Sequence, residues 1–115
     1  MLRDEALLLD MLLSARKALR FTRGVDWAKF EADELIQNAV MHVIQIVGEA
    51  ATKISDEFKT AHAEIPWKAI SGMRHRLVHD YTRIDVPTVW RVVQVHLPPM
   101  IAQIEPLIPP ETPSP

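Results

Sequence analysis

Residues 33–54, DELIQNAVMHVIQIVGEAATKI, form the stretch of sequence that decides the fold. Its apolar residues recur at intervals of three and four, the spacing that places side chains on one face of an α-helix. The residues in this stripe are Ile36, Ala39, Val43, Ile46, Val47, Ala50 and Ile54. The stretch therefore predicts a helix from about Asp33 to Lys53 that packs against others in a helical bundle.

Segments on both sides of this stretch predict further helical structure. Before it, residues 2–21 place apolar side chains three and four apart, and Thr22-Arg23-Gly24 should end that helix. Asp26 should cap a short turn, and Ser55 should cap another that ends near His62. These short turns connect the longer helices of the predicted bundle.

The second half of the chain predicts two more helices and a tail. One helix should follow Ile65-Pro66, and its apolar residues are Trp67, Ile70, Met73, Leu77 and Val78. Asp85 with Pro87 indicates the start of another, which Pro98-Pro99 should bend or break before a last helical stretch from Met100 to Ile108. Residues 109–115 contain four prolines and should form a flexible Pro-rich tail.

The composition agrees with one small helical domain. The chain has 115 residues, enough for a single hydrophobic core, and 48% of them are hydrophobic and 24% charged. Only 6% are aromatic and three are glycine, while good helix formers dominate long stretches. We therefore expect an all-α fold, an up-and-down bundle of four to five helices over residues 1–108.

The same composition excludes several classes of protein. Without cysteine, the chain has no disulfide, no thiolate zinc site and no cysteine nucleophile. The first twenty residues carry charges throughout, and no run of about 18 uncharged apolar residues occurs, so we expect a cytoplasmic protein without a membrane span. A net charge of -2 provides no general attraction to nucleic acid, so any RNA contact must come from a local basic patch.

Residues 67–83 supply such a patch. Its ionisable side chains are Lys68, Arg74, Arg76 and Arg83, a single acid, Asp80, and the histidines His75 and His79. Arginine offers a fixed fork of donors for a phosphate, and histidine exchanges protons near neutral pH. Together they can remove a 2′-hydroxyl proton, stabilise charge on the reacting phosphorus and protonate the leaving 5′-oxygen. Such a set of side chains can therefore cleave RNA without a metal.

Within the patch, residues 72–81, GMRHRLVHDY, resemble the HepT-like branch of the HEPN superfamily. The shared motif is Arg74, four residues, His79, one residue and Tyr81. Three other segments resemble the same branch: Val47-Gly48-Glu49-Ala50-Ala51, Ile65-Pro66-Trp67, and Val89-Trp90 with Leu97-Pro98. The resemblance spans roughly residues 4 to 108 and implies a HEPN-type helical bundle.

The resemblance also implies a function, that of the ribonuclease toxin in a type VII toxin-antitoxin system, acting without a cofactor. Arg74 and His79 would be the catalytic residues, with His75 in support, and formation of a homodimer would bring two motifs to one cleft. Tyr81 falls where a minimal nucleotidyltransferase, the antitoxin partner, attaches AMP to silence the toxin. The added charge and bulk would stand where an RNA phosphate must bind.

Other residues are candidates for supporting this site. Lys68, Arg76 and Arg83 would contact the substrate RNA, a tRNA or an mRNA. The long helix also carries a polar stripe at spacings of four, three and four: Asn38, His42, Gln45 and Glu49. Such a stripe is usually only a solvated face. Because the resemblance places this helix beside the motif, Glu49 or His42 could instead orient the catalytic side chains.

Helix geometry limits how Arg74 and His79 can meet. Five residues at about 100° each separate them by roughly 140° around an ideal helix, so they do not share a face. Either the helix ends before His79, or the long arginine side chain reaches round, or a second subunit brings its own copies. Trp67 and Trp90 are expected to be core or dimer-interface residues, since large aromatic side chains dominate such packing.

Three alternative interpretations remain open. His75 and His79 could bind zinc, with His42, Glu49 or His62 as a third ligand, although we predict no metal. The chain could be a non-catalytic module that binds a nucleotide or a partner, although a histidine that titrates near neutral pH beside an arginine favours an enzyme. The inhibitory partner is disfavoured, because no Gly-Ser dipeptide followed by spaced aspartates, the nucleotidyltransferase pattern, occurs.

Overall fold

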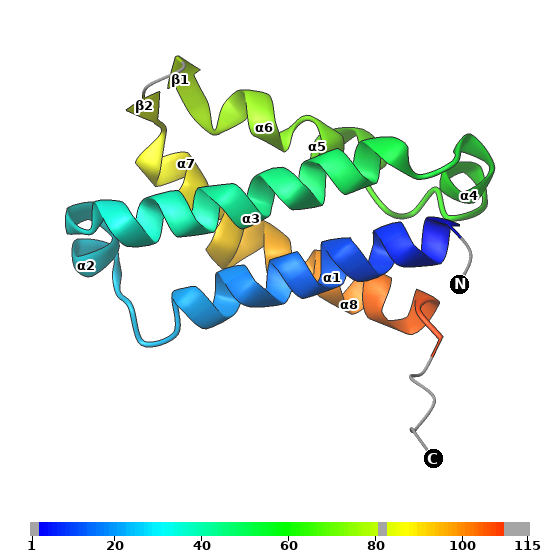
Figure 1. Cartoon of the computed structure of the whole chain (residues 1–115), viewed down its shortest axis with the longest axis horizontal. Helices are drawn as coiled ribbons and strands as arrows, with labels where there is room; N and C mark the ends of the chain where they lie inside the picture. The colour runs from blue at the N-terminus through cyan, green and yellow to red at the C-terminus, as the bar shows by residue number, and fades with distance from the viewer. Residues whose placement is uncertain (1–2, 81–82, 110–115) are drawn as a thin grey trace.

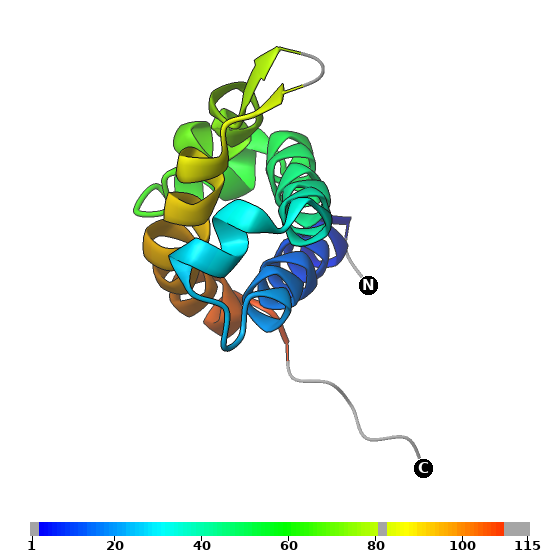
Figure 2. The same ribbon diagram turned by 90° about the vertical axis from the view of Figure 1, so that its left-hand side faces the viewer.

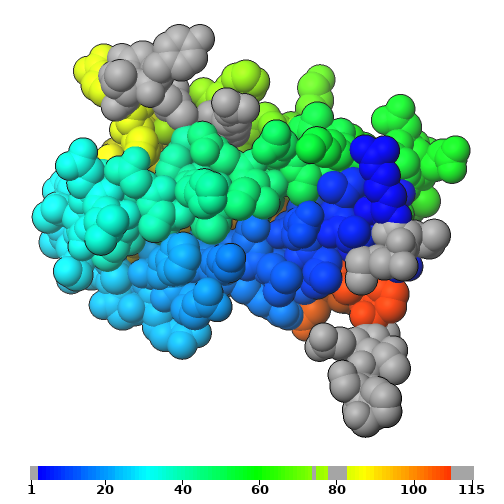
Figure 3. All heavy atoms as spheres, viewed as in Figure 1, coloured from blue at the N-terminus to red at the C-terminus, as the bar shows by residue number. Residues whose placement is uncertain are grey.

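The centre of the fold is a pair of antiparallel helices, α1 (Arg3–Phe21) and α3 (Glu34–Lys53), which lie side by side (Figure 1). The computed structural model describes residues 3–80 and 83–109, apart from the side chains of Arg74 and residues 78–80. Two short helices, α2 (Trp27–Ala32) and α4 (Asp56–Ala61), lie at opposite ends of this pair. In the space-filling view, α1 and α3 together form one continuous face of the molecule (Figure 3).

The second half of the chain forms a layer on the other side of α1 and α3 (Figure 2). Its helices are α5 (Trp67–Ser71), α6 (Met73–Arg76), α7 (Val86–Arg91) and α8 (Leu97–Ile104), with a π-helical segment, Val92–His96, before α8 and a 3-10 turn, Glu105–Leu107, after it. A hairpin of β1 (Val78–Asp80) and β2 (Arg83–Ile84) follows α6. α5 and α6 pack on α3, and α8 packs on α1. The predicted all-α helical bundle is therefore confirmed.

Side-chain caps fix where four of these helices begin, at the residues that the sequence indicates. Asp26, Asp33, Ser55 and Asp85 each accept a hydrogen bond from the backbone N–H three residues further on, at 2.9, 3.0, 3.2 and 3.2 Å. Each bond satisfies a donor that the first turn of a helix leaves without a backbone partner. In the turn after α1, Gly24 has a φ of 74°, a conformation that favours glycine.

The buried face of α3 is wider than the predicted stripe and is rotated from it. Ile36, Ala39 and Ile46 belong to the predicted stripe but are only half-buried. The buried residues outside the prediction are Gln37, Val40, Met41, Ile44, Gly48 and Ala51. α3 contacts α1, α2, α5, α6 and α7, so neighbours on several sides bury a broad arc of its surface. The buried Gln37 amide nitrogen donates to the Phe30 and Glu31 carbonyls at 2.8 and 3.0 Å, which joins α3 to α2.

The single helix predicted from Trp67 to Val78 is wrong, because the chain divides there into α5, α6 and β1. Gly72 stands at the first break, and glycine is a poor residue for a helix interior. At the second break Leu77 is fully buried, and its carbonyl accepts a hydrogen bond of 2.8 Å from the Asp85 N–H. β1 then pairs with β2 in antiparallel register, with Val78 opposite Ile84. The hydrogen bond between the Asp85 N–H and the Leu77 carbonyl, eight residues apart, thus takes the place of the bond that a further turn of helix would make.

The helical path that starts at Val86 continues through Pro98-Pro99. Neither proline has the N–H that would bond a carbonyl four residues earlier. The wider π-helical turn Val92–His96 lies directly before them. At the place where a bend or break was expected, the helix therefore changes from α-helical to π-helical winding and continues. Of the predicted tail, residues 110–115 lie outside the described residues. No helix in the described part of the chain combines the length and apolar character needed to cross a membrane.

One polar contact joins the start of α1 to the junction between α3 and α4. The Asp4 carboxylate accepts hydrogen bonds from the Ser55 hydroxyl at 2.6 Å and from the Ser55 backbone N–H at 2.9 Å. These two bonds, the side-chain bond first, lower the pKa of Asp4 below its ordinary value. Since the folded pKa is the lower one, the contact stabilises the fold above the ordinary carboxyl pKa and is lost as the pH falls through the folded pKa.

We expect Asp4→Asn to lower the melting temperature near pH 7 by about 1 to 4 °C, a small effect because the contact is exposed. The difference from the parent protein should disappear in acid, where Asp4 is protonated in both states. Thermal unfolding followed by circular dichroism between pH 2.5 and 7 measures it. Glu5→Gln, which removes the neighbouring first-turn charge, is the control. A difference that persists at the lowest pH would contradict this account.

Candidate active site

The predicted motif lies where α6 gives way to the β1–β2 hairpin, at one edge of the molecule (Figures 1 and 2). Arg74 and His75 belong to α6, and His75 is exposed. His79 is the central residue of β1, and Tyr81 lies outside the described residues. Of the three ways in which Arg74 and His79 could meet, the described backbone matches the first, because the helix ends at Arg76.

The end of α6 changes the geometry of the motif. In a strand successive side chains point to opposite faces, and each residue advances the chain by about 3.3 Å. The separation of roughly 140° that an ideal helix would impose on Arg74 and His79 therefore does not apply. The base of the hairpin is fixed by Asp85, whose N–H bonds the Leu77 carbonyl and whose carboxylate caps α7. The arrangement places a cation-bearing helical turn directly before a strand that carries a histidine.

α3 supports this edge through a close backbone contact at Gly48. A Cβ atom placed on Gly48 would lie 3.3 Å from the Ile70 carbonyl oxygen and 3.8 Å from that of Ser71. The Ile70 carbonyl also accepts the Gly72 N–H at the end of α5. Met73, the first residue of α6, is buried next to this contact. The missing side chain of Gly48 thus lets the end of α5, and with it α6, lie close against α3.

The remaining candidates lie at exposed positions of α3, α5, α6 and β2. Lys68 of α5 and Arg83 of β2 are exposed, and the Arg76 guanidinium donates to the Ala69 carbonyl at 3.0 Å. His42 and Glu49 both lie on the exposed face of α3. The predicted polar stripe of α3 is thus accessible to solvent, and whether it orients the motif stays a prediction.

The histidines and acids of the described part of the chain form no group of three that could hold a metal ion. His62 is engaged elsewhere: its Nδ1 lies 3.6 Å from the Glu64 carboxylate, and its ring lies 4.3 Å from the ring of Phe58. It forms the C-terminal cap of α4. The side chain of His79 is not among those described, so the zinc alternative is not tested at that position.

The two tryptophans that the sequence assigns to the core or a dimer interface contribute to packing within the chain. Trp67 is 7% exposed, and its indole Nε1 donates to the His62 carbonyl at 3.0 Å. Trp90 is half-buried, with its ring 4.9 Å from that of Phe30 and 6.0 Å from that of Trp27. The hairpin and the role of Asp85 in closing it were not predicted. The sequence assigned Asp85 only as a helix cap. That assignment was the one feature of the sequence that pointed to a structural role for Asp85.

A helical bundle with this motif at its edge defines a protein of the HEPN type. The family described as "Ribonuclease HepT-like" matches residues 11–107, and the chain belongs to that family. It is 37% identical to "Probable ribonuclease HepT" of Thermococcus cleftensis over 76% of this chain and 79% of that protein. It is 33% identical to "Putative RNase MJ1380" of Methanocaldococcus jannaschii over 88% of this chain and 93% of that protein. No solved structure gives a significant match.

The contact at Gly48 generates a stability prediction. Alanine normally favours a helix interior over glycine by about 1 kcal/mol. At Gly48 we expect the opposite sign, with Gly48→Ala lowering the melting temperature and Gly48→Ser lowering it further, because a backbone carbonyl stands 3.3 Å from the new Cβ. Thermal unfolding tests it, with Glu49→Ala on the neighbouring exposed position as the control. A higher melting temperature for Gly48→Ala would show that α5 is free to move away.

Proposed function

We propose that the chain is a metal-independent endoribonuclease, the cytoplasmic toxin of a type VII toxin-antitoxin system that cleaves tRNA or mRNA. Membership of the HepT-like ribonuclease family supports the reaction class. The names of its relatives, a probable ribonuclease and putative RNases, agree with it. The observation that carries the proposal is the position of Arg74 and His79 on either side of the α6-to-β1 junction, within an exposed basic segment.

The proposed reaction uses the 2′-hydroxyl of the RNA as its nucleophile. His79 acts as general base or general acid, and the 2′-oxygen attacks the adjacent phosphorus as its proton is removed. The Arg74 guanidinium stabilises the negative charge that builds on the phosphoryl oxygens. The bond to the 5′-oxygen then breaks, and that oxygen leaves with a proton from the acid. The products are a 2′,3′-cyclic phosphate and a 5′-hydroxyl, and His75 assists from α6.

We further propose that the working unit is a homodimer whose two motifs share a cleft. One junction provides a single Arg74 and a single His79 for a reaction that needs a base, an acid and a charge stabiliser. A second copy would supply the missing proton-transfer group. A composite site of this kind also accounts for the exposure of His75 and Lys68 on one edge of the monomer.

The proposal assigns regulation to Tyr81, the only tyrosine of the chain. A minimal nucleotidyltransferase would act as antitoxin by transferring AMP to its hydroxyl. Tyr81 is two residues from His79, so the added phosphate would place negative charge beside the catalytic residues and repel the RNA backbone. Modification at this position would therefore block substrate binding without unfolding the protein.

Cleavage of total tRNA and a model mRNA by the purified, unmodified protein tests the catalytic assignment. We expect His79→Ala and Arg74→Ala each to lower the rate by about 100-fold or more, while EDTA leaves it unchanged. His96→Ala and Arg23→Ala, at exposed positions outside the motif, should cleave like the parent protein. Products with 3′-hydroxyl ends, or loss of cleavage in EDTA, would contradict the mechanism. No cleavage by a folded dimer would favour the non-catalytic binding module.

Incubation with a minimal nucleotidyltransferase and ATP tests the regulatory assignment. We expect intact-mass spectrometry to detect AMP on the parent protein and cleavage to be lost in proportion to the modified fraction. Tyr81→Phe should gain no AMP under the same conditions, because it lacks the accepting hydroxyl. AMP found on Tyr81→Phe, or a fully modified protein that still cleaves RNA at the parent rate, would refute the role of Tyr81.

A further inference from the structure

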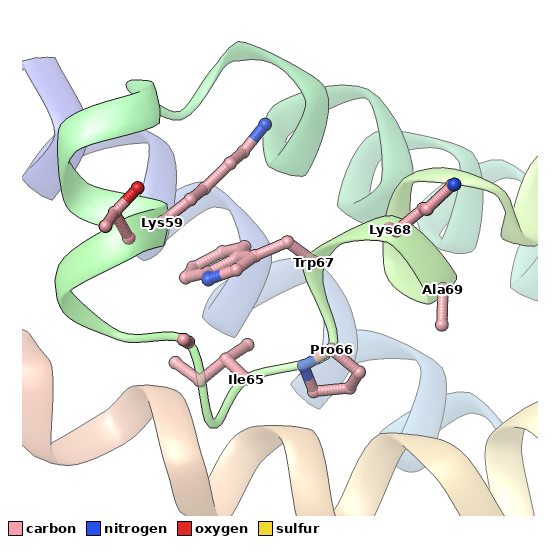
Figure 4. A pocket seen from close by; sticks show the side chains of 8 residues that line it. Lys59, Ile65, Pro66, Trp67, Lys68 and Ala69 are labelled. Atoms are coloured by element: carbon pink, nitrogen blue, oxygen red, sulfur yellow. The ribbon is translucent and has the colours of Figure 1, made fainter.

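An open groove of about 870 Å³ lies between α4 and α5, outside the motif (Figure 4). Its lining includes Lys59 and Thr60 of α4, the extended step Ile65-Pro66, and Trp67, Lys68 and Ala69 of α5. The groove and the motif are two ends of one segment, because α5 ends at Ser71 and α6 begins at Met73. The groove residues of α5 therefore come directly before the motif helix in the chain.

The lining combines an apolar surface with two cations. Figure 4 shows the indole of Trp67 next to Lys59, with Ile65 and Pro66 below it, while the Lys68 side chain points away from the indole. Trp67 is held in place by its hydrogen bond to the His62 carbonyl and by an edge-on contact with Phe58, at 6.0 Å between ring centres. Trp67 and Ile65 are only 7% and 2% exposed, so they support the groove from beneath, and the exposed Pro66 is the apolar side chain on which a flat group can lie.

A third cation connects the groove to the motif helix. The Arg76 side chain extends back from α6 along α5 and donates to the carbonyl of Ala69, which also lines the groove. Among the described side chains, which do not include that of Asp80, no ion pair involves Lys59, Lys68 or Arg76. The Lys59 amine donates to the Thr52 carbonyl of α3 at 3.5 Å. The nearby Glu64 carboxylate lies 3.6 Å from His62 instead. The positive charges of Lys59, Lys68 and Arg76 thus follow one another from α4 through α5 to α6.

We infer that this groove binds the single-stranded RNA that flanks the cleaved phosphodiester. Lys59, Lys68 and Arg76 contact successive phosphates, and one base lies against the exposed Pro66. The inference rests on the proposed ribonuclease function and adds Lys59, which lies outside the motif, to the substrate-binding surface. A polyanion whose bases have flat π faces matches three cations and an apolar lining better than an acidic protein segment, which lacks the bases.

The test measures binding of the full-length protein to a fluorescent single-stranded RNA that is 2′-O-methylated throughout and so cannot be cleaved. We expect Lys59→Gln/Lys68→Gln to raise Kd by about tenfold or more and to lower the slope of log Kd against log salt by about 1.4, which is 0.7 for each lost phosphate contact. Lys17→Gln/Arg20→Gln, two exposed cations of α1, is the matched control and should bind like the parent protein.

A second pair of variants tests the groove without removing a lysine. Ala63→Glu places a carboxylate on an exposed position that lines the groove, and Ala28→Glu places one on an exposed position of α2 at the other end of the bundle. We expect Ala63→Glu to weaken RNA binding by at least about tenfold through charge repulsion and Ala28→Glu to have no effect. Circular dichroism confirms that each variant is folded.

Cleavage of unmodified RNA by the parent protein, measured in parallel, separates the two proposals. Groove-dependent binding together with cleavage supports the inference. Groove-dependent binding without cleavage would contradict the ribonuclease, and with it a groove that flanks a cleaved phosphodiester, and would leave an RNA-binding surface. Cleavage by the parent together with parent-like Kd and salt slope in all groove variants would overturn the inference alone and leave an acidic protein segment as the occupant. Neither binding nor cleavage by the parent would overturn both.

Discussion

The burial of α3 among its neighbours is the constraint on which the rest of the molecule depends. α1 packs along one side of α3, while α5, α6 and α7 pack on others, so most of the core lies on or against this helix. The apolar arc of α3 extends over Val40, Val43, Ile44 and Val47. Burial of such an arc is the main favourable term for a chain of this size. The polar stripe with His42 and Glu49 is what the neighbours leave exposed.

The sequence predicted what depends on a few neighbouring residues and missed what depends on distant ones. The caps at Asp26, Ser55 and Asp85 were predicted because each bond closes within three residues, and Asp33 was predicted only as the start of its helix. The buried arc of α3 was predicted only in part, since its width is set by helices that follow much later in the chain. Leu77 and Val78 fit the apolar face of a helix, yet the bond from Asp85 to the Leu77 carbonyl favours a hairpin.

The same distinction separates the motif from the groove. Arg74, His79 and Tyr81 stand at fixed spacings, so a pattern of residues is enough to select them. Lys59 belongs to no such pattern. It comes near Lys68 because Trp67 packs beneath α4, where its indole bonds the His62 carbonyl and its ring meets Phe58. Packing of the Trp67 side chain thus brings Lys59 and Lys68, which are nine residues apart in the sequence, to the lining of one groove.

α5 connects the groove to the motif and sets their relative position, although it is only five residues long. Trp67 fixes its first residue to the end of α4, and the contact between Gly48 and the Ile70 carbonyl fixes its last turn to α3. A helix of this length has no intrinsic stability in water, so its position is set by these two contacts. Because the groove lies at one end of α5 and α6 begins beyond the other, the two contacts set the distance and direction between them. A ligand that held α5 through the groove would for the same reason restrict the motion of the junction that carries the motif.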